Sequence, residues 1–317
     1  MEYVKLGNSG LEVSRICLGC MGFGETHNEQ NARTLSLEEA RPIINYALDL
    51  GINFFDNANQ YSNGTSERIV GQVLNEAITL GKVDRDELVI TSKLYYPMAE
   101  GPNHKGLSRK IIFSEVEKSL ERLQLDYLDL YIIHRFDYTT PVEETMEALH
   151  DLVKLGKVRY IGASSMYAWQ FQKCQYIAEK HGWTKFISMQ DLQNLLYREE
   201  EREMIPLCKD MGVGMTPWSP LAHGRLVKEI DELNNETAED VEIIHRVHEL
   251  ALKKKVPRAA IALAWLFTNK QVTAPIVGAS KMTHLDDAMM SLEVELTKEE
   301  KAYLEEPYKF REIAYFR

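Results

Sequence analysis

Residues 128–165 read LDLYIIHRFDYTTPVEETMEALHDLVKLGKVRYIGASS, and the order of patterns in this stretch decides the fold. Two short runs rich in β-branched, aromatic and leucine residues, Leu128–His134 and Val158–Ser164, have the composition of buried strands. Between them, Val142–Leu155 carries apolar residues at helical spacing, and Gly156 follows its last periodic residue. Glycine ends helices because it enters a left-handed conformation without steric cost. The stretch therefore predicts a strand, a helix and a second strand.

The same alternation extends over the rest of the chain. The helical segments Leu37–Leu50 and Glu67–Leu80 also stop at a glycine. The further strand-like runs are Ser14–Gly19, Asn53–Ala58, Leu88–Leu94, Phe186–Asp191, Gly212–Trp218 and Pro275–Gly278. Eight strands separated by helices predict parallel pairing with right-handed crossovers, in a closed barrel or in an open doubly wound sheet. An open sheet that binds a dinucleotide needs GxGxxG after its first strand, whereas residues 19–24 read GCMGFG. We therefore predict an α/β fold of the (β/α)8 TIM barrel type.

Three further features complete the predicted architecture. The turn signal Gly7-Asn8-Ser9-Gly10 predicts an N-terminal β-hairpin. Two longer irregular stretches, Phe23–Leu35 and Leu221–Asp240, are predicted to be long loops over the C-terminal face of the barrel. Neither stretch has the composition of an interdomain linker, so we predict a single domain over residues 1–317.

Composition and charge exclude several classes of protein. The chain has 317 residues, of which 44% are hydrophobic and 27% charged, a balance that suits a large buried core. The net charge of −11 disfavours a nucleic-acid partner, because phosphate binding needs a basic face. The chain starts with neither the basic nor the apolar segment of a signal peptide, and no apolar run approaches the ~20 residues of a membrane helix. We expect a cytoplasmic protein with no membrane partner.

The remaining clusters of polar residues do not predict a metal site. Cys17 and Cys20 form a CxxC pair, but no second such pair completes a site. His245 and His248 lack a third ligand, so we interpret them as part of a solvated helix face. The acidic run Glu199–Glu203 is interpreted as the start of a helix, where carboxylates suit the helix dipole.

Polar side chains that can do chemistry follow three consecutive strand runs. Asp56 comes after Asn53-Phe54-Phe55, Tyr61 lies five residues later, and Lys93 and His134 end the next two runs. The carboxyl ends of barrel strands meet at one rim, so these four side chains are predicted to converge there. A lone lysine would be a solvated residue and a lone histidine a satisfied core group, but four together predict a catalytic site.

On these motifs the sequence resembles the aldo-keto reductase family, on the side that includes aryl-alcohol dehydrogenases and potassium-channel β subunits. Residues 55–67, FDNANQYSNGTSE, resemble the family signature of an aspartate and a tyrosine ahead of Ser-Glu. ITSK at 90–93 and IIH at 132–134 resemble its lysine and histidine motifs. The resemblance runs over nearly the whole chain. It implies an NADPH-dependent oxidoreductase that reversibly reduces aldehydes or ketones to alcohols.

The chemistry of this reaction explains the four residues. Hydride transfer to a carbonyl carbon puts negative charge on the oxygen, so the site needs a proton donor and hydrogen-bond donors aimed at that oxygen. The resemblance implies that Tyr61 is the general acid and that His134 orients the carbonyl. A free tyrosine titrates near ~10. We expect Lys93, held by Asp56, to lower the pKa of Tyr61.

The resemblance also implies a cofactor site along the later strands. Ser164 and Gln190 match residues that hold the nicotinamide carboxamide, and Trp218 matches a ring that lies against the nicotinamide. Ser165 and Asp191 both stand where asparagine is common, and the effect of the carboxylate at Asp191 is left open. The cofactor-binding residues that the resemblance implies are Met21, Asp56, Ser164, Ser165, Gln190, Trp218, Ser219, Pro220, Leu221, Gly224, Gly278, Ser280, Lys281, His284 and Asp287.

The same resemblance leaves the choice of cofactor and substrate partly open. Ser280 and Lys281 match residues that bind the 2′-phosphate of NADPH, but His284 stands where many relatives carry arginine, so NAD stays open as well. The substrate is expected to be a small carbonyl or alcohol. The tail after Pro307 differs from the usual ending of this subgroup. The expected substrate residues are Tyr95, Arg135, Phe136, Met166 and Trp169.

Two other functions are kept as alternatives. Lys93 could form a Schiff base, as in barrel aldolases, although this leaves Asp56 and Tyr61 without a role. The chain could instead bind NADPH in a regulatory role like that of a channel β subunit, because a fold does not settle a function.

Overall fold

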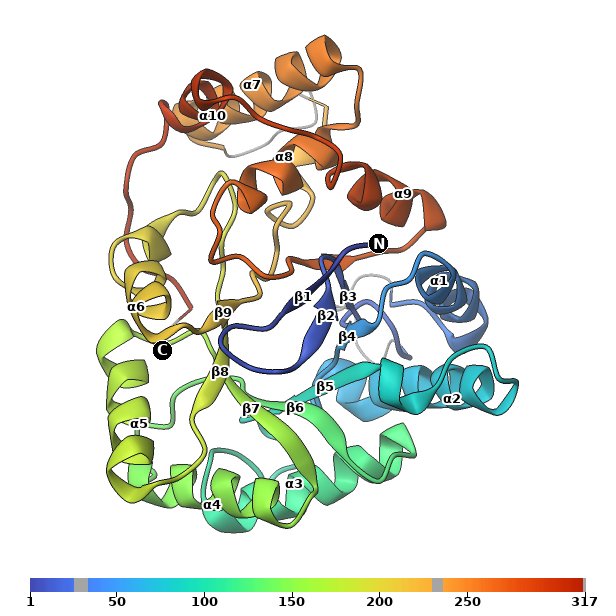
Figure 1. Ribbon diagram of the computed structural model, residues 1–317, viewed down its shortest axis with the longest axis vertical. Coiled ribbons are helices and arrows are strands. Elements are labelled where there is room, and N and C mark those ends of the chain that lie inside the picture. The colour runs from blue at the N-terminus through green and yellow to red at the C-terminus, as the bar shows by residue number, and fades with distance from the viewer. Residues whose placement is uncertain (26–33, 230–235, 316–317) are drawn as a thin grey trace.

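The computed structural model describes residues 1–25, 34–229 and 236–315 and has eight parallel strands at its centre (Figure 1). The strands are ordered β10-β3-β4-β5-β6-β7-β8-β9 in the sheet. Their bounds are β3 Cys17–Gly19, β4 Phe54–Asp56, β5 Val89–Leu94, β6 Leu128–Ile133, β7 Val158–Ser164, β8 Phe186–Gln190, β9 Gly214–Met215 and β10 Ile276–Gly278. The two edges meet, because the Ile276 amide donates to the Pro217 carbonyl at 2.9 Å and Met215 pairs with Val272. The (β/α)8 barrel is confirmed.

Helices form the outer layer around these strands (Figure 1). They are α1 Leu37–Asp49, α2 Thr65–Thr79, α3 Arg109–Leu123, α4 Val142–Lys154, α5 Ala168–His181, α6 Met204–Met211, α7 Ala238–Lys254, α8 Arg258–Phe267, α9 Met282–Met290 and α10 Lys298–Glu305, with short 3-10 turns at η1 Tyr61–Gly64, η2 Arg85–Glu87, η3 Glu199–Glu201 and η4 Arg225–Val227. The predicted glycine stops hold, since Gly51, Gly81 and Gly156 all have positive φ just after their helices. Within the described ranges, no helix has both the length and the apolar character needed to cross a membrane.

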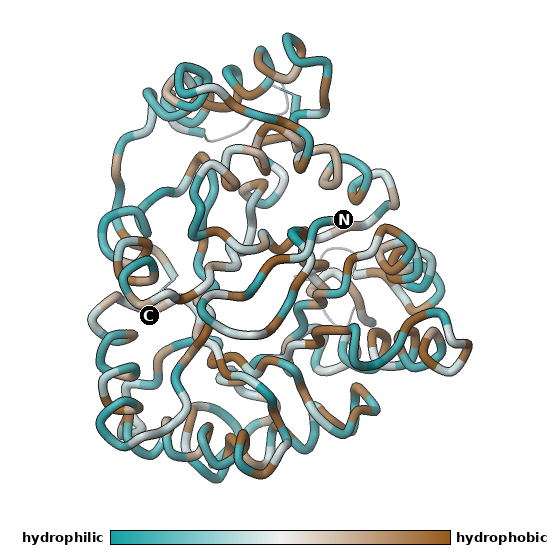
Figure 2. The backbone as a smooth tube through the Cα atoms, in the orientation of Figure 1, coloured by the Kyte–Doolittle hydropathy of each residue, from teal (hydrophilic) through white to brown (hydrophobic). Residues whose placement is uncertain are grey.

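The core has two layers because side chains alternate along each strand. One face of the strands points into the barrel and carries Phe54, Val89 and Leu130, while the other packs against the helices. Apolar residues accordingly follow the central strands and the facing sides of the helices in Figure 2. The predicted hairpin is present as β1 Tyr3–Lys5 and β2 Glu12–Ser14. Its Leu6 and Val13 are fully buried in the inner layer, so the hairpin closes the bottom of the barrel.

Two elements differ from the sequence prediction. The seventh barrel strand is only Gly214–Met215 rather than Gly212–Trp218, because Gly212 caps α6 with a φ of 67° and Pro217 has no amide hydrogen to donate. The acidic run Glu199–Glu203 does start helical structure, but as the 3-10 turn η3 with Glu199 and Glu200 buried, and α6 follows with Glu203 as its N-cap.

The two predicted loops over the barrel mouth are described only in part. The first is closed at its base, since Leu35 donates to Gly22 at 2.8 Å and accepts from Gly24 at 2.9 Å. Residues 26–33 of the first loop and 230–235 of the second lie outside the described residues.

Gly71 of α2 offers a test of how closely the helical layer packs beside the barrel. A Cβ at this position would lie 2.4 Å from the Leu123 carbonyl oxygen at the end of α3. We expect Gly71→Ala to lower the free energy of unfolding by about 1–3 kcal/mol, because rigid backbone must move to make room. Alanine's better helix propensity, worth up to about 1 kcal/mol, offsets only part of this. Urea unfolding followed by circular dichroism measures the change.

The matched control for this variant is Gly22→Ala, because a Cβ there would meet no atom within 4 Å. We expect it to change stability by less than about 0.5 kcal/mol. Equal unfolding midpoints for both variants would contradict the close approach of α2 to α3.

Candidate active site

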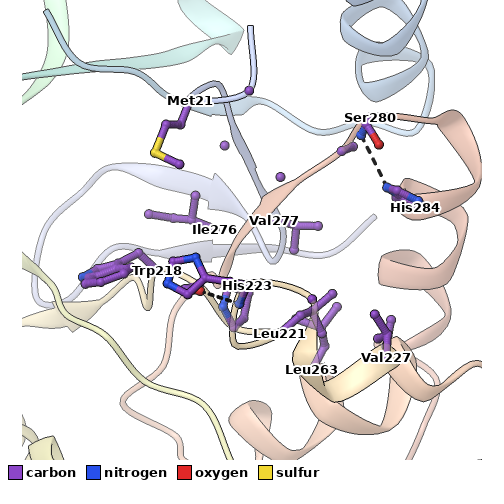
Figure 3. A pocket seen from close by; sticks show the side chains of 18 of the residues that line it. Met21, Trp218, Leu221, His223, Val227, Leu263, Ile276, Val277, Ser280 and His284 are labelled. Carbon is purple, nitrogen blue, oxygen red and sulfur yellow. Dashed lines mark hydrogen bonds between the residues drawn. The ribbon is translucent and has the colours of Figure 1, made fainter. Parts of the chain in front are cut away.

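A cavity of about 920 Å³ opens at the carboxyl ends of the strands, which is where barrel enzymes carry their active sites. It is long, running from Tyr61 and His134 at one end to Ser280 and His284 at the other. Figure 3 shows Met21 and Trp218 on opposite sides of one part of it, with Leu221, Val227 and Leu263 further along. The predicted residues that line it are Met21, Asp56, Tyr61, His134, Arg135, Ser164, Gln190, Trp218, Ser219, Pro220, Leu221, Gly224, Gly278, Ser280, His284 and Asp287.

A buried ion pair lies beneath the Tyr61 end of this cavity. Asp56 ends β4, and its Oδ2 accepts from the Lys93 ammonium of β5 at 2.7 Å. Lys93 also donates to the Asn57 carbonyl oxygen at 2.8 Å and is fully buried. Burial disfavours the ammonium, but Asp56 and Tyr61 outweigh it and hold the pKa of Lys93 above its usual value. Lys93 therefore carries its positive charge at neutral pH.

Tyr61 begins η1 and lies directly against this pair. The Lys93 nitrogen lies 4.7 Å from the centre of its ring, and the hydroxyl is a hydrogen-bond partner of the ammonium. Burial raises the pKa of Tyr61 to about 12, although Lys93 acts in the opposite direction. Lys93 acts on this pKa in the expected direction, but burial outweighs it, so the pKa of Tyr61 is raised and not lowered. The phenol keeps its proton at neutral pH and can donate it.

His134 follows β6 and faces Tyr61 across the cavity, with the two ring centres 6.0 Å apart. Burial, together with the charges of Lys93 and Arg135, lowers the pKa of His134 well below its usual value. Its imidazole is therefore neutral and has one N–H to donate. Its Nδ1 is buried without a hydrogen-bond partner among the described residues, while the edge of Tyr96 packs 5.1 Å away, centre to centre.

One wall of the cavity is a chain of hydrogen bonds from β7 and β8. The Gln190 side-chain amide donates to Asp56 at 2.8 Å, and the Ser164 hydroxyl donates to the Gln190 carbonyl at 2.7 Å. Ser165 lies behind this wall rather than on the cavity, where its Oγ accepts from the Trp218 indole at 3.1 Å. The indole is thereby fixed at the cavity surface.

At the far end, the structure brings in residues that sequence reasoning missed. Arg258 and His248 line the cavity, and the Arg258 guanidinium lies 2.8 Å from the Glu229 carboxylate and 3.4 Å from His248. The interpretation of His248 as part of a solvated face is wrong, since it points toward the cavity from α7. Lys281 is exposed at the start of α9 and does not line the cavity as described. No sequence signal marks α7 and α8 as cavity walls, because their position depends on tertiary packing.

The expected substrate residues divide into two groups. Arg135 lines the cavity beside His134, and the Arg135 guanidinium donates to the His134 carbonyl oxygen at 2.6 Å. Tyr96, which the sequence analysis missed, lines the cavity next to them. The other expected residues lie outside the cavity lining, either packed behind it or on the surface: Tyr95, Phe136, Met166 and Trp169.

With this geometry in hand, comparison with known proteins gives the family. The sequence profile of the Aldo/keto reductase family matches residues 15–309. A versiconal hemiacetal acetate reductase of Aspergillus parasiticus is 44% identical, with 97% of each chain covered. An aldo-keto reductase of Alternaria alternata is 43% identical over 98% of this chain and 93% of its own. A provisionally named aryl-alcohol dehydrogenase of Schizosaccharomyces pombe is 44% identical over 96% and 95%.

The protein is therefore an oxidoreductase by class, and the chain belongs to the aldo/keto reductase family. The resemblance found in its motifs is confirmed.

The buried ion pair makes a stability prediction. Lys93→Met leaves the Asp56 carboxylate buried without its cation. We expect the free energy of unfolding to fall by about 3–5 kcal/mol. Lys82→Met breaks the exposed pair with Asp49, which has the same kind of contact at 2.8 Å, and should cost at most about 1 kcal/mol. Urea unfolding of both variants measures the difference, and similar losses would mean that the Asp56–Lys93 pair carries no special weight.

Proposed function

We propose that this protein reduces aldehydes or ketones to alcohols with NADPH, reversibly, with Tyr61 as the general acid. The observation that carries the proposal is the convergence of a protonated tyrosine, a charged lysine and a neutral histidine at one end of a long cavity. These states suit carbonyl reduction, in which negative charge develops on one oxygen. The family assignment supports the same reaction class.

The residues along the cavity fit a nicotinamide dinucleotide. The cavity volume lies at the upper end of the range for small-ligand sites, which is about 300–1,000 Å³. Trp218 offers an apolar ring face beside the polar groups of Ser164 and Gln190. A Cβ on Gly224 or Gly278 would meet no atom within 4 Å, so backbone lies open to a phosphate chain there. When bound, NADPH supplies the hydride.

Each residue of the chain then has a separate task. Tyr61 donates its proton to the substrate oxygen, and Lys93 stabilises the tyrosinate that remains. Asp56 holds Lys93 charged and in place. His134, being neutral, donates one N–H to the carbonyl oxygen and orients it. Tyr96 and Trp218 line the cavity near these groups, which favours aromatic or medium-length aliphatic aldehydes.

The Schiff-base alternative fits less well. A Schiff-base lysine must be a free amine that the substrate can reach. Lys93 is fully buried, is paired with Asp56 and has a pKa above its usual value. The alternative of a regulatory NADPH-binding protein is separated from the enzyme by turnover, which the following assay measures.

Oxidation of NADPH at 340 nm with a panel of aromatic and straight-chain aldehydes tests the function. We expect turnover in the wild type and a loss of about 10²–10⁴-fold in kcat for Tyr61→Phe, because the proton donor is removed. NADPH binding by the variant should stay within a few-fold. Tyr176→Phe, an exposed tyrosine on α5, is the control and should keep full turnover. Tight NADPH binding without turnover would favour the regulatory role instead.

Cofactor preference gives a second test. Lys281 carries a positive charge beside Ser280, where the 2′-phosphate of NADPH is proposed to bind. We expect Lys281→Met to weaken NADPH binding about tenfold, because one charged contact to the phosphate is lost. NADH lacks this phosphate, so its binding should change by less than about twofold. Lys298→Met, a change of the same charge on α10, is the control. Equal effects on both cofactors would exclude a 2′-phosphate contact at Lys281.

A further inference from the structure

A second pair of buried ionisable groups lies behind the Trp218 wall of the cavity. Asp191 follows β8 and Glu200 lies in η3, and the two carboxyl groups are hydrogen-bond neighbours. Asp191 is fully buried and Glu200 is 4% exposed. In the described part of the chain, Asp191 Oδ2 and Glu200 Oε1 find no donor from any other group. A proton on either carboxyl group would provide a donor for the other, so one proton could satisfy both oxygens.

Two adjacent carboxylates in a buried site do not readily both stay ionised, because burial leaves their mutual repulsion largely unscreened. A single proton between them forms an O–H···O bond and satisfies both oxygens at once. Burial raises the pKa of Asp191, and burial together with the charge of Asp191 raises the pKa of Glu200 well above its usual value. The two groups titrate as one unit, which keeps at least one proton at neutral pH.

The pair is connected to the cavity wall through Asp191. Its Oδ1 accepts from the Ser165 amide at 2.8 Å, and its carbonyl oxygen accepts from the Trp218 amide at 2.9 Å. Ser165 has a φ of 45°, a left-handed conformation that is unfavourable for serine and must be held by its partners. Its Oγ in turn accepts from the Trp218 indole at 3.1 Å. Asp191 thus holds Ser165 directly and positions the Trp218 indole indirectly, through Ser165.

We propose that Asp191 and Glu200 share a proton and act together as positioning residues for the nicotinamide end of the site, by holding Ser165 and Trp218. This role rests on the proposed function. An asparagine at this position would supply the same acceptor without a proton to lose. Loss of the shared proton places two charges side by side, drives them apart and withdraws the acceptor from Ser165. Cofactor binding then weakens at alkaline pH.

The other ionisable groups that face the pair do not replace this proton. From the β6 loop, Arg135 favours ionisation of Asp191, whereas Glu199 in η3 opposes ionisation of Glu200. Burial raises the pKa of Tyr197 to about 12 and raises that of Cys208 on α6 as well. Both groups therefore stay neutral through the range in which the pair titrates.

Thermal unfolding without cofactor tests the shared proton. Asp191→Asn keeps the acceptor for Ser165 and gives Glu200 an N–H donor, so no proton is needed. An acid whose pKa is raised on folding stabilises the fold fully below its unfolded pKa, near ~4 for Asp and Glu, and loses that contribution as pH rises through its folded value. We therefore expect the melting temperature of Asp191→Asn, relative to wild type, to gain roughly 2–4 °C or more between pH 5 and pH 9. The shared proton is wrong if the difference in melting temperature between the two proteins does not depend on pH. It is also wrong if the wild type becomes the more stable of the two, relative to pH 5, at pH 9.

Titration with NADPH, followed by tryptophan fluorescence, tests the positioning role. We expect the wild-type Kd to rise about tenfold more than that of Asp191→Asn between pH 7 and pH 11, the range over which the shared proton is lost. Glu200→Gln should also flatten the profile, because its amide can donate to the Asp191 carboxylate. Asp191→Leu, which removes the acceptor, should bind about tenfold more weakly at every pH.

The outcomes separate the two proposals. If NADPH binds but the wild-type and Asp191→Asn profiles coincide, the positioning role is wrong and the reductase proposal stands. If no variant binds NADPH, the proposed function is wrong and the positioning role falls with it. The shared proton is then decided by the unfolding measurements alone, which need no cofactor.

Discussion

The buried ion pair between Asp56 and Lys93 is the constraint on which the rest of the site depends. An ammonium without access to water is tolerated only where a carboxylate and further acceptors surround it. Here Asp56 and the Asn57 carbonyl provide them, and Asp56 in turn accepts from Thr91 and Gln190. The charge of this pair sets the states of its neighbours. It helps to keep His134 neutral, and Lys93 acts to lower the pKa of Tyr61 against the effect of burial.

Strand alternation explains why these groups meet. On β4, Phe54 points into the barrel, and Asp56 lies two residues later on the same face. On β6, Leu130 and Ile132 point into the barrel, and His134 follows at the next inward position. The parallel register brings Asp56 opposite Thr91 and Lys93 opposite Ile132. The lower layers of the barrel at these strands are therefore apolar, and the reactive groups Asp56, Lys93 and His134 stand at the carboxyl ends of β4, β5 and β6. Its chemistry is held on a rigid support.

This regularity also determines what the sequence could predict. The barrel, the hairpin and the convergence of Asp56, Lys93 and His134 follow from periods of 2 and 3.6 residues, which are visible in one sequence. The pKa of Tyr61 does not follow, because it depends on how far burial outweighs one nearby cation. Arg258 and His248 could not be assigned either, since they belong to helices whose contact with the cavity arises only from packing. The burial of Glu199 could not be predicted for the same reason, because its partners come from distant parts of the chain.

Gln190 and Asp191 join the two buried pairs into one wall. Gln190 donates to Asp56, its carbonyl oxygen accepts from Ser164, and the next residue binds Ser165. One end of this wall is fixed by opposite charges, which need no proton, and the other by two acids, which do. The same backbone carries both ends, because Gln190 and Asp191 are neighbours in the chain. The shared proton that we propose at Asp191 and Glu200 therefore makes one end of this wall dependent on pH, while the hydrogen bonds at the Asp56 end stay the same.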